Sequence, residues 1–265
     1  MKYVAFLDIL GFKNKLKSMT QQEAKKYIGD FSAIVYSIFQ STDSVVNGYI
    51  VSDSVILHTS DTKLESLQSI ITTVDAICKN EFAQNGILIR GAIAKGEFDK
   101  MPAMELPKLQ KQLIVGQAYV DAYLLEDKVK TIGINLSEEV YQDVLNSNSA
   151  LNILEEKINE KMCYVYRYLT LDYLLIESNM KKFIKLAQEA KWLPHYYNTL
   201  YFAMKRETSD KKIEQLFINI QNIVSDNSPG ENWRELDVFF KNAFAERVID
   251  EFKTRLLKHI RINIV

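Results

Sequence analysis

Two aspartates lie inside apolar runs that are typical of β-strands, and this feature constrains the fold most. Asp8 lies in the run from residue 3 to residue 12, and Asp53 lies in the run from residue 48 to residue 57. An ionised carboxylate in an apolar strand is costly unless it is paired or binds a cation. Two such residues predict one site at which both carboxylates bind a hard divalent metal such as Mg²⁺. This arrangement is typical of phosphoryl and nucleotidyl chemistry.

Composition and charge exclude several other classes of protein. The chain has 265 residues and a net charge of -1, so it lacks the basic field that attracts nucleic acid or an anionic membrane. No stretch approaches the roughly 20 apolar residues that span a bilayer, and no signal peptide is recognisable. The two cysteines, Cys78 and Cys163, fit no metal or redox spacing and are expected to be reduced core thiols. We therefore expect a cytoplasmic protein without nucleic-acid or membrane partners.

The order of apolar patterns in the first hundred residues predicts a ferredoxin-like core of the α+β class. Thr20 and Glu23 have the spacing of a capping box at the start of a helix. Ser52 and Asp53 are expected at the bend of a hairpin. The predicted elements are a strand over 2–10, a helix over 20–39, a hairpin over 45–57, a helix over 64–78 and a strand over 87–94.

The rest of the chain divides into a short mixed part and a helical part. Strands are expected over 113–116, 131–136 and 163–169, helices over 117–127 and from Ser137 as N-cap, and a loop over 98–112. From about residue 172 the pattern is helical, with a long apolar helix face between Val238 and Ile260 and a break over 227–230. We predict two domains, 1–170 and a helical C-terminal extension over 171–265.

Five segments, in order, resemble the catalytic domain of class III nucleotide cyclases. Residues 6–12 resemble the first metal motif, Phe-x-Asp-Ile-x-Gly-Phe, and Ser52-Asp53 resembles the Gly-Asp of the second. The other three segments are 89–97, 115–122 and 132–141. The chain is also similar, over nearly its whole length, to a divergent group of bacterial cyclase-like proteins. That similarity rests further on residues 116–126, 172–174 and 192–198.

The resemblance implies a site for a nucleoside triphosphate. Asp8, Asp53 and the carbonyl of Ile9 would bind Mg²⁺ or Mn²⁺. The turn Gly11-Phe12-Lys13 would offer backbone N–H groups, and the Lys13 charge, to phosphate. Class III sites lie between two subunits, so a homodimer is implied.

Three positions depart from the family's pattern. In frame, the ribose-binding Asn falls on Val120, the transition-state Arg on Leu124 and the purine-selecting Asp on Leu113. Loss of a cation that stabilises transition-state charge costs about 10³ or more in rate. The missing cation has three candidates elsewhere in the chain, which are Arg90, Lys95 and Arg167.

Three further charged residues have two interpretations each. Arg90 is either catalytic or a structural arginine that pairs with Glu97. Asp121 and Glu126 either bind the nucleotide or a metal, or are ordinary charges of a helix surface.

The sequence leaves three functions open, and with them the question of whether the protein is an enzyme. The first is a metal-dependent cyclase that converts a nucleoside triphosphate into a 3',5'-cyclic nucleotide and pyrophosphate. One form of this hypothesis has a pyrimidine substrate and a role in bacterial signalling or anti-phage defence. The second is a degenerate cyclase-fold module that binds nucleotide or protein without turnover. The third is oligonucleotide synthesis on a related core, against which the net charge of -1 argues.

Overall fold

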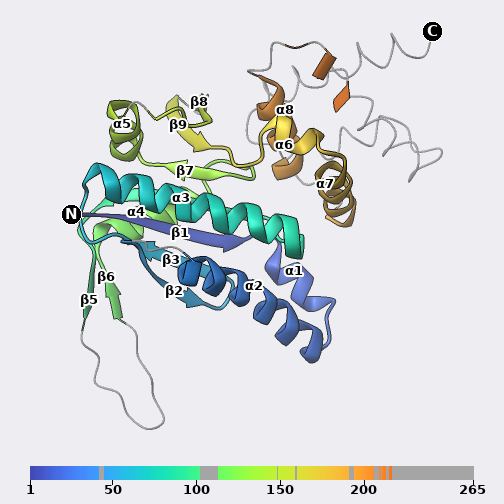
Figure 1. Ribbon diagram of the computed structural model, residues 1–265, viewed down its shortest axis with the longest axis horizontal. Coiled ribbons are helices and arrows are strands. Elements are labelled where there is room, and N and C mark those ends of the chain that lie inside the picture. Colours follow the sequence, from blue (N-terminus) through green and yellow to red (C-terminus); the bar gives the residue numbers. More distant parts are fainter. Residues whose placement is uncertain are drawn as a thin grey trace, which may run out of the picture. The chain divides into compact units, whose positions relative to one another are not determined.

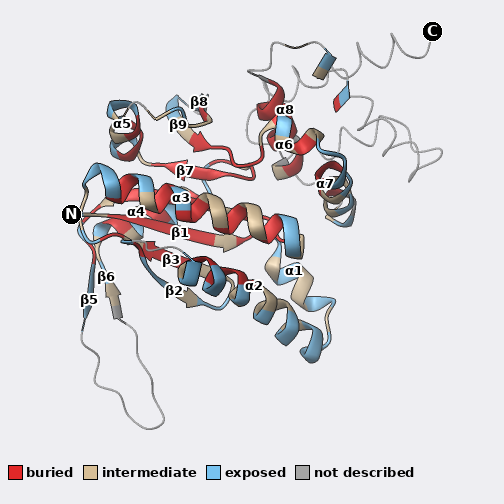
Figure 2. Cartoon of the chain, in the orientation of Figure 1, coloured by how far each residue is buried: buried red, intermediate tan, exposed pale blue. Residues whose placement is uncertain are grey.

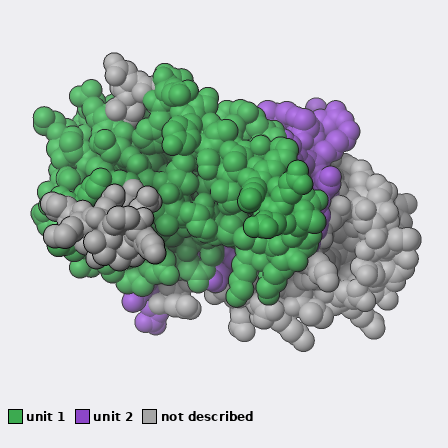
Figure 3. All heavy atoms as spheres, turned by 90° about the horizontal axis from the view of Figure 1, so that it is seen from below, with its two compact units in different colours: residues 1–128, 134–153, 163–168 green, residues 129–133, 154–162, 169–265 purple. Residues whose placement is uncertain are grey.

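The structure is a computed structural model that describes residues 1–41, 45–101, 113–147, 149–158, 160–190, 194–205, 209, 211–212 and 215–216. The chain forms two compact units, which Figure 3 colours separately. The first unit comprises residues 1–128, 134–153 and 163–168, and the second comprises the described residues of 129–133, 154–162 and 169–265. The expected domain boundary at residue 170 stays a prediction.

The first unit combines strands and helices in one α+β arrangement (Figure 1). Its elements in chain order are β1 (Lys2–Ile9), α1 (Phe12–Lys17), α2 (Gln21–Ser41), β2 (Asn47–Val51), β3 (Ser54–His58), α3 (Leu64–Asn80), the π-helix η1 (Glu81–Asn85), β4 (Ile89–Gly96), β5 (Asp99–Met101), β6 (Leu113–Val115), α4 (Gln117–Glu126), β7 (Ile134–Leu136) and α5 (Glu138–Asn146). Most of the strand β9 (Lys161–Tyr166) also belongs to this unit, whereas nearly all of the strand β8 (Ile153–Ile158) belongs to the second unit.

The main sheet has the strand order that a ferredoxin-like core requires. Its strands run β2-β3-β1-β4-β7-β9, and β1 pairs antiparallel with both β3 and β4. β2 pairs antiparallel with β3, whereas β7 lies parallel to β4. The predicted α+β class and the β-α-β-β-α-β core are therefore confirmed by the sheet itself.

The hairpin of β2 and β3 turns where the sequence predicts it. Ser52 has a φ of 58°, which is the left-handed conformation found in tight turns, and β3 starts two residues later. The backbone N–H of Ile9 donates a hydrogen bond to the carbonyl of Asp53 at 3.2 Å. The bend therefore returns to the end of β1.

One face of the sheet packs towards α3 and α5. The hydroxyl of Tyr3 donates to Asp143 of α5 at 2.7 Å and to the carbonyl of Thr62, just before α3, at 3.3 Å. α3 buries one apolar stripe, and α2 packs beside it. The helix α2 begins at a capping box, as predicted, in which Thr20 N–H donates to Glu23 at 2.7 Å and Glu23 N–H donates to the Thr20 hydroxyl at 3.3 Å.

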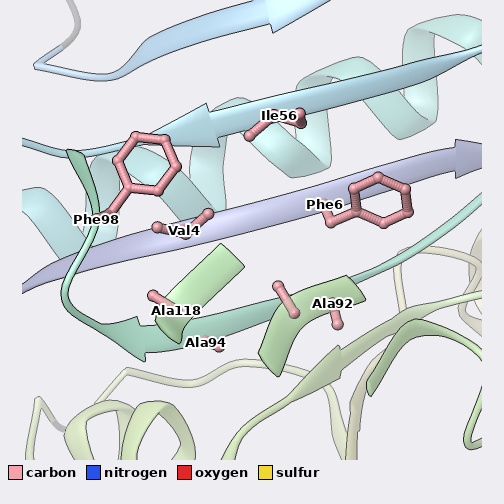
Figure 4. Packing of buried hydrophobic residues seen from close by; sticks show 8 residues of the cluster. Val4, Phe6, Ile56, Ala92, Ala94, Phe98 and Ala118 are labelled. Carbon is pink, nitrogen blue, oxygen red and sulfur yellow. The ribbon is translucent and has the colours of Figure 1, made fainter. Parts of the chain in front are cut away.

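The other face of the sheet packs against α4. Figure 4 shows side chains of β1, β3 and β4 beside Ala118 of α4. The buried members of this cluster are Val4, Phe6, Ile56, Ala92, Ala94, Phe98, Ala118 and Ala122. Since side chains alternate across a strand, Asp8 lies on the same face as Val4 and Phe6. Figure 2 shows how strongly the central strands are buried.

Several elements differ from the sequence-based expectations. Residues 99–101 form β5, which pairs with β6, although the whole segment 98–112 was expected to be a loop. β8 was not predicted, because three consecutive charged residues, Glu155, Glu156 and Lys157, interrupt its apolar pattern. β7 starts only at Ile134, after a turn in which Thr131 N–H donates to the carbonyl of Val129 at 2.8 Å. Cys163 is only half-buried, whereas Cys78 is fully buried, and both are free thiols.

The second unit contains helices among its described residues, as the sequence predicts. They are α6 (Leu171–Leu175), α7 (Glu177–Glu189) and α8 (Pro194–Lys205). Within this unit the Thr199 hydroxyl accepts from Ile132 N–H at 2.8 Å. The break at 227–230, the apolar face of 238–260 and part of the segment 192–198 lie outside the described residues. Among the described helices, none combines the length and hydropathy that crossing a membrane requires.

Candidate functional site

Asp8 lies near the end of β1, on the face of the sheet that packs against α4. It is paired across the sheet with Ser54 of β3 on one side and with Arg90 of β4 on the other. Directly opposite residues of antiparallel strands point to the same face, so all three side chains share it. The Ser54 hydroxyl donates to the Asp8 carboxylate at 3.3 Å. The Asp8 side chain is 21% exposed, which leaves it open to a ligand.

Asp53 lies at the bend of the β2–β3 hairpin, beside the same end of β1. Burial raises the pKa of Asp8, and the charge of Asp53 raises it further. The Arg90 guanidinium and the Ser54 hydroxyl act in the opposite direction without cancelling the increase. The two carboxylates therefore repel one another electrostatically, and a shared cation would relieve that repulsion. The sequence-based prediction that both aspartates bind one divalent metal stays a prediction.

The donor set suits a hard divalent cation. Asp8 and Asp53 supply carboxylate oxygens, whereas the carbonyl of Ile9 as a third ligand stays a prediction. Among the described residues, no group of three or more His, Cys, Asp or Glu side chains has a metal-binding arrangement. Mg²⁺ is commonly bound by one or two carboxylates while substrate phosphates and water complete its shell. The two aspartates fit that mode, in which the substrate supplies the remaining ligands.

Arg90 extends from β4 into the same group of charges. Its side chain forms ion pairs with Asp8 at 3.6 Å, with Glu126 at 2.5 Å and with Asp127 at 2.8 Å. The alternative pairing with Glu97 is wrong, since the Glu97 carboxylate lies 3.5 Å from the N-terminal ammonium instead. The reason is distance along the strand, because Arg90 lies near the start of β4 and Glu97 follows its last residue, Gly96.

The other two candidate cations lie elsewhere. Lys95 is on the opposite face of β4, where its ammonium pairs with Asp143 at 2.6 Å. Arg167 follows β9 and donates a hydrogen bond to the side chain of Asn152. Of the three cations that the sequence offers in place of the family's arginine, Arg90 is the one beside Asp8.

The turn after β1 forms the start of a short helix. Gly11 has a φ of 77° and precedes α1, which begins at Phe12. The Phe12 ring stacks on Tyr27 with ring centroids 6.3 Å apart, and Lys13 is exposed. The contact of Gly11, Phe12 and Lys13 with phosphate stays a prediction.

The two acidic residues of α4 differ in their surroundings. Asp121 accepts a hydrogen bond from Gln117 of the preceding turn at 2.7 Å, which is typical of a helix surface. Glu126 is buried and pairs with Arg90. Binding of a nucleotide by Asp121 and Glu126 stays a prediction. The sequence reasoning missed Ser54 and Asp127, although the Ser54 position next to Asp53 was a usable signal.

Two of the three positions that depart from the cyclase pattern lie on the outer side of α4. Val120 is 44% exposed and Leu124 is 59% exposed, and Tyr123 between them is exposed as well. Leu113 begins β6. An apolar stripe therefore occupies the part of α4 where the family pattern has Asn and Arg.

No protein-family model and no curated protein matches the chain. Several solved structures are similar to it. One is the guanylyl cyclase domain of the RhoGC fusion protein from Blastocladiella emersonii, with a TM-score of 0.48, 16% identity and coverage of 62% of this chain and 92% of that one. Another is the adenylyl cyclase CyaB from P. aeruginosa, with a TM-score of 0.47, 15% identity and coverage of 63% and 93%.

A third similar structure is the guanylate cyclase domain of RhGC from Catenaria anguillulae, solved in complex with GTP. It has a TM-score of 0.47 and 16% identity, and it covers 63% of this chain and 95% of that chain. These three similar structures are thus adenylyl and guanylyl cyclase domains at low sequence identity.

Proposed function

We propose that this protein is a metal-dependent nucleotide cyclase that converts a nucleoside triphosphate into a 3',5'-cyclic nucleotide and pyrophosphate. One observation carries the proposal. Asp8 lies near the end of β1, and Asp53 lies at the β2–β3 bend, where its backbone carbonyl accepts from the N–H of Ile9, the next residue after Asp8, at 3.2 Å; the charge of Asp53 also raises the pKa of Asp8. Such a pair is stabilised when a divalent cation neutralises both charges.

The chemistry follows from what this group can hold. The oxygen of the 3'-hydroxyl bonds to the α-phosphorus and gives up its proton to solvent, while the bond from that phosphorus to pyrophosphate breaks. Mg²⁺ or Mn²⁺, when bound, would supply positive charge for the attacking and leaving oxygens. Asp8, Asp53 and the carbonyl of Ile9 would hold the cation, and Ser54 orients the Asp8 carboxylate through its hydrogen bond.

The proposal includes a homodimer, as the resemblance to class III cyclases implies. It keeps Gly11, Phe12 and Lys13 as phosphate contacts and Arg90 as a catalytic residue. The division into a catalytic domain over 1–170 and a helical extension over 171–265 belongs to the same proposal. A cyclic pyrimidine product would support the signalling or anti-phage role.

A second candidate function is a cyclase-fold module that binds a nucleotide or a protein without turnover. The exposed apolar residues Val120 and Leu124 favour it, because they occupy the positions of the family's Asn and Arg. The two candidates differ in a single respect that an assay can measure, which is product formation.

The assay is direct. The purified protein is incubated with each of the four nucleoside triphosphates and Mn²⁺, and pyrophosphate and cyclic nucleotide are measured by mass spectrometry. We expect product with at least one triphosphate, and none from the Asp8→Asn or Asp53→Asn variant. Glu65→Gln is the matched control, since Glu65 is an exposed carboxylate of α3.

Metal binding is measured separately from turnover. Mn²⁺ is expected to raise the melting temperature of the wild type and of Glu65→Gln, but not of the two aspartate variants. Metal binding without any product supports the binding module. If Mn²⁺ shifts all four proteins equally, the aspartates are not its ligands and the cyclase proposal fails.

A further inference from the structure

Each of the three nitrogen atoms of the Arg90 guanidinium meets a different carboxylate. Nε lies 2.5 Å from Oε1 of Glu126, Nη1 donates to Oδ1 of Asp127 at 2.8 Å, and Nη2 lies 3.6 Å from Oδ2 of Asp8. The Glu126 contact is a close ion pair without the alignment of a hydrogen bond. The planar fork of an arginine is suited to such multiple contacts, whereas a lysine ammonium is not. Two sides of the fork are thus held by one helix end, and the third side faces the proposed metal site.

The holding residues belong to a part of α4 that is fixed to the sheet. Glu126 is the last residue of α4, and its side chain is only 8% exposed. The side chain of Asn135 in β7 donates to the carbonyl of Glu126 at 3.0 Å, and Asn135 is paired with Ala92 of β4. The end of α4 at Glu126 is therefore bonded to β7, the strand next to β4, which carries Arg90. Such support limits where the guanidinium can point.

The contact with Asp8 is the longest of the three, and it is the one that a bound metal would replace. A divalent cation on Asp8 takes over the neutralisation of that carboxylate, so Nη2 is left without its anion while Nε and Nη1 keep theirs. Arginine is well suited to a phosphate oxygen at such a position. Asp8, Glu126 and Asp127 bring three carboxylates to one guanidinium, and this excess of negative charge favours a metal-bound triphosphate over a free anion.

We propose that Glu126 and Asp127 are positioning residues, which hold Arg90 so that its Nη2 binds a phosphate oxygen of a triphosphate whose metal lies on Asp8 and Asp53. The inference rests on the proposed function and adds to it the side chain that supplies positive charge to the triphosphate. Arg90 of β4 supplies, within the same chain, a charge that Leu124 of α4 does not carry.

The test uses inorganic tripolyphosphate, which requires no knowledge of the base. Calorimetry of the full-length protein measures the affinity for Mn²⁺ alone and then for tripolyphosphate in saturating Mn²⁺. We expect Arg90→Ala to weaken tripolyphosphate binding by about tenfold to a hundredfold, the usual effect of losing a hydrogen bond to a charged group. The same variant is expected to bind Mn²⁺ alone at least as tightly as the wild type, because Arg90 competes with the metal for Asp8.

Glu126→Gln is expected to weaken tripolyphosphate binding about tenfold in the wild-type background. In the Arg90→Ala background it should add nothing, because Glu126 acts only through Arg90. A merely structural role would not give this non-additivity. Asp127→Asn tests the positioning of Arg90 at a more exposed position, where the substitution disturbs folding least. We expect it to weaken tripolyphosphate binding about twofold to fivefold. Glu65→Gln serves as control for the loss of one carboxylate.

The outcomes separate the inference from the function on which it rests. If Glu126→Gln and Asp127→Asn leave tripolyphosphate binding unchanged, or if Glu126→Gln has the same effect without Arg90, the positioning role is overturned while the metal site stands. If the wild type binds Mn²⁺ but not tripolyphosphate, the phosphate contact is overturned. If it binds no Mn²⁺ at all, the proposed function fails first and the inference fails with it.

Discussion

Glu81 is a buried carboxylic acid outside the candidate site. It is fully buried at the start of the π-helix η1, and the side chain of Asn85 donates to it at 2.9 Å. Burial raises the pKa of Glu81 to about 8, and the charge of Asp30 contributes in the same direction. Glu81 is therefore protonated in the folded protein at neutral pH, although it is ionised in the unfolded chain.

The raised pKa of Glu81 predicts that its contribution to the free energy of unfolding decreases as pH rises. Because the folded state binds the extra proton, the free energy of unfolding decreases as pH rises from the unfolded pKa near 4.5 to the folded pKa near 8. Between pH 5 and pH 8 the decrease is at most about 4 kcal/mol by linkage. Glu81→Gln should remove this component, which urea denaturation at several pH values measures. The control Glu65→Gln should retain it, and an equal slope in both variants would contradict the prediction.

A second prediction concerns Asp8, whose replacement should not lower the stability of the metal-free protein but should abolish its stabilisation by Mn²⁺. Its raised pKa means that the ionised carboxylate is less favourable in the folded protein than in the unfolded chain. Asp8→Asn should therefore melt no lower than the wild type at pH 7 without metal. Mn²⁺ at a hundredfold excess over Kd should stabilise the wild type by about 2.7 kcal/mol and the variant not at all.

The pH dependence of metal binding follows from the same group. Mn²⁺ affinity should fall as pH decreases through the raised pKa of Asp8, because protons compete for the carboxylate. Thermal melts with and without Mn²⁺ between pH 4 and pH 8 measure this. A metal-induced shift that is constant over this range would count against Asp8 as a ligand.

At the scale of elements, the pairing of β1 with β4 depends on Gly91. A Cβ atom added there would lie 2.4 Å from the carbonyl oxygen of Phe6 and 3.2 Å from the Cα of Leu7, both of which are backbone atoms of β1. The two strands would have to separate, and they carry Asp8 and Arg90. Gly91 is thus needed for the geometry of the candidate site as well as for the sheet.

Gly91→Ala should lower the free energy of unfolding by about 1–3 kcal/mol, as overpacking of a core does. The matched control is Gly29→Ala in α2, where an added Cβ meets no atom within 4 Å. That substitution should stabilise by about 0.5–1 kcal/mol through helix propensity. Chemical denaturation of both variants gives the comparison. Equal effects of the two substitutions would show that the close approach at Gly91 is not limiting.

Most elements of the first unit were predictable because their signals are local. The capping box of Thr20 and Glu23, the bend at Ser52 and the N-cap Ser137, whose hydroxyl accepts from Val140 N–H at 3.4 Å, all act within a few residues. The short strands β5 and β8 were missed. The three-residue strand β5 is stable only through its pairing with β6, from which a long segment separates it. The strand β8 has consecutive charged residues at its centre, which weaken the apolar pattern of a strand.

At the scale of the whole molecule, the proposed homodimer has a surface that fits it. Val120, Tyr123 and Leu124 expose apolar side chains on α4, which is a cost in water unless another surface covers them. Leu124→Asp should therefore shift the protein from dimer to monomer in light scattering coupled to gel filtration, and should lower product formation with it.

Leu145→Asp is the matched control for the dimer. Leu145 is 50% exposed and lies on α5, which packs on the other face of the sheet. This variant should remain dimeric. A wild type that is monomeric at all concentrations would contradict the proposed assembly, and a dimer that tolerates Leu124→Asp would place the interface elsewhere.

The amino-acid sequence was sufficient to predict the α+β class and the order of the core elements, whereas a common site of Asp8 and Asp53 stays a prediction. The class and the order depend on hydrophobic periodicity and on turn residues, which act over short distances, and a ferredoxin-like order then fixes which strands are neighbours. Only the tertiary structure decided the partners of Arg90. The face on which a strand residue points and the helix end that meets it depend on register and packing between segments far apart in the chain.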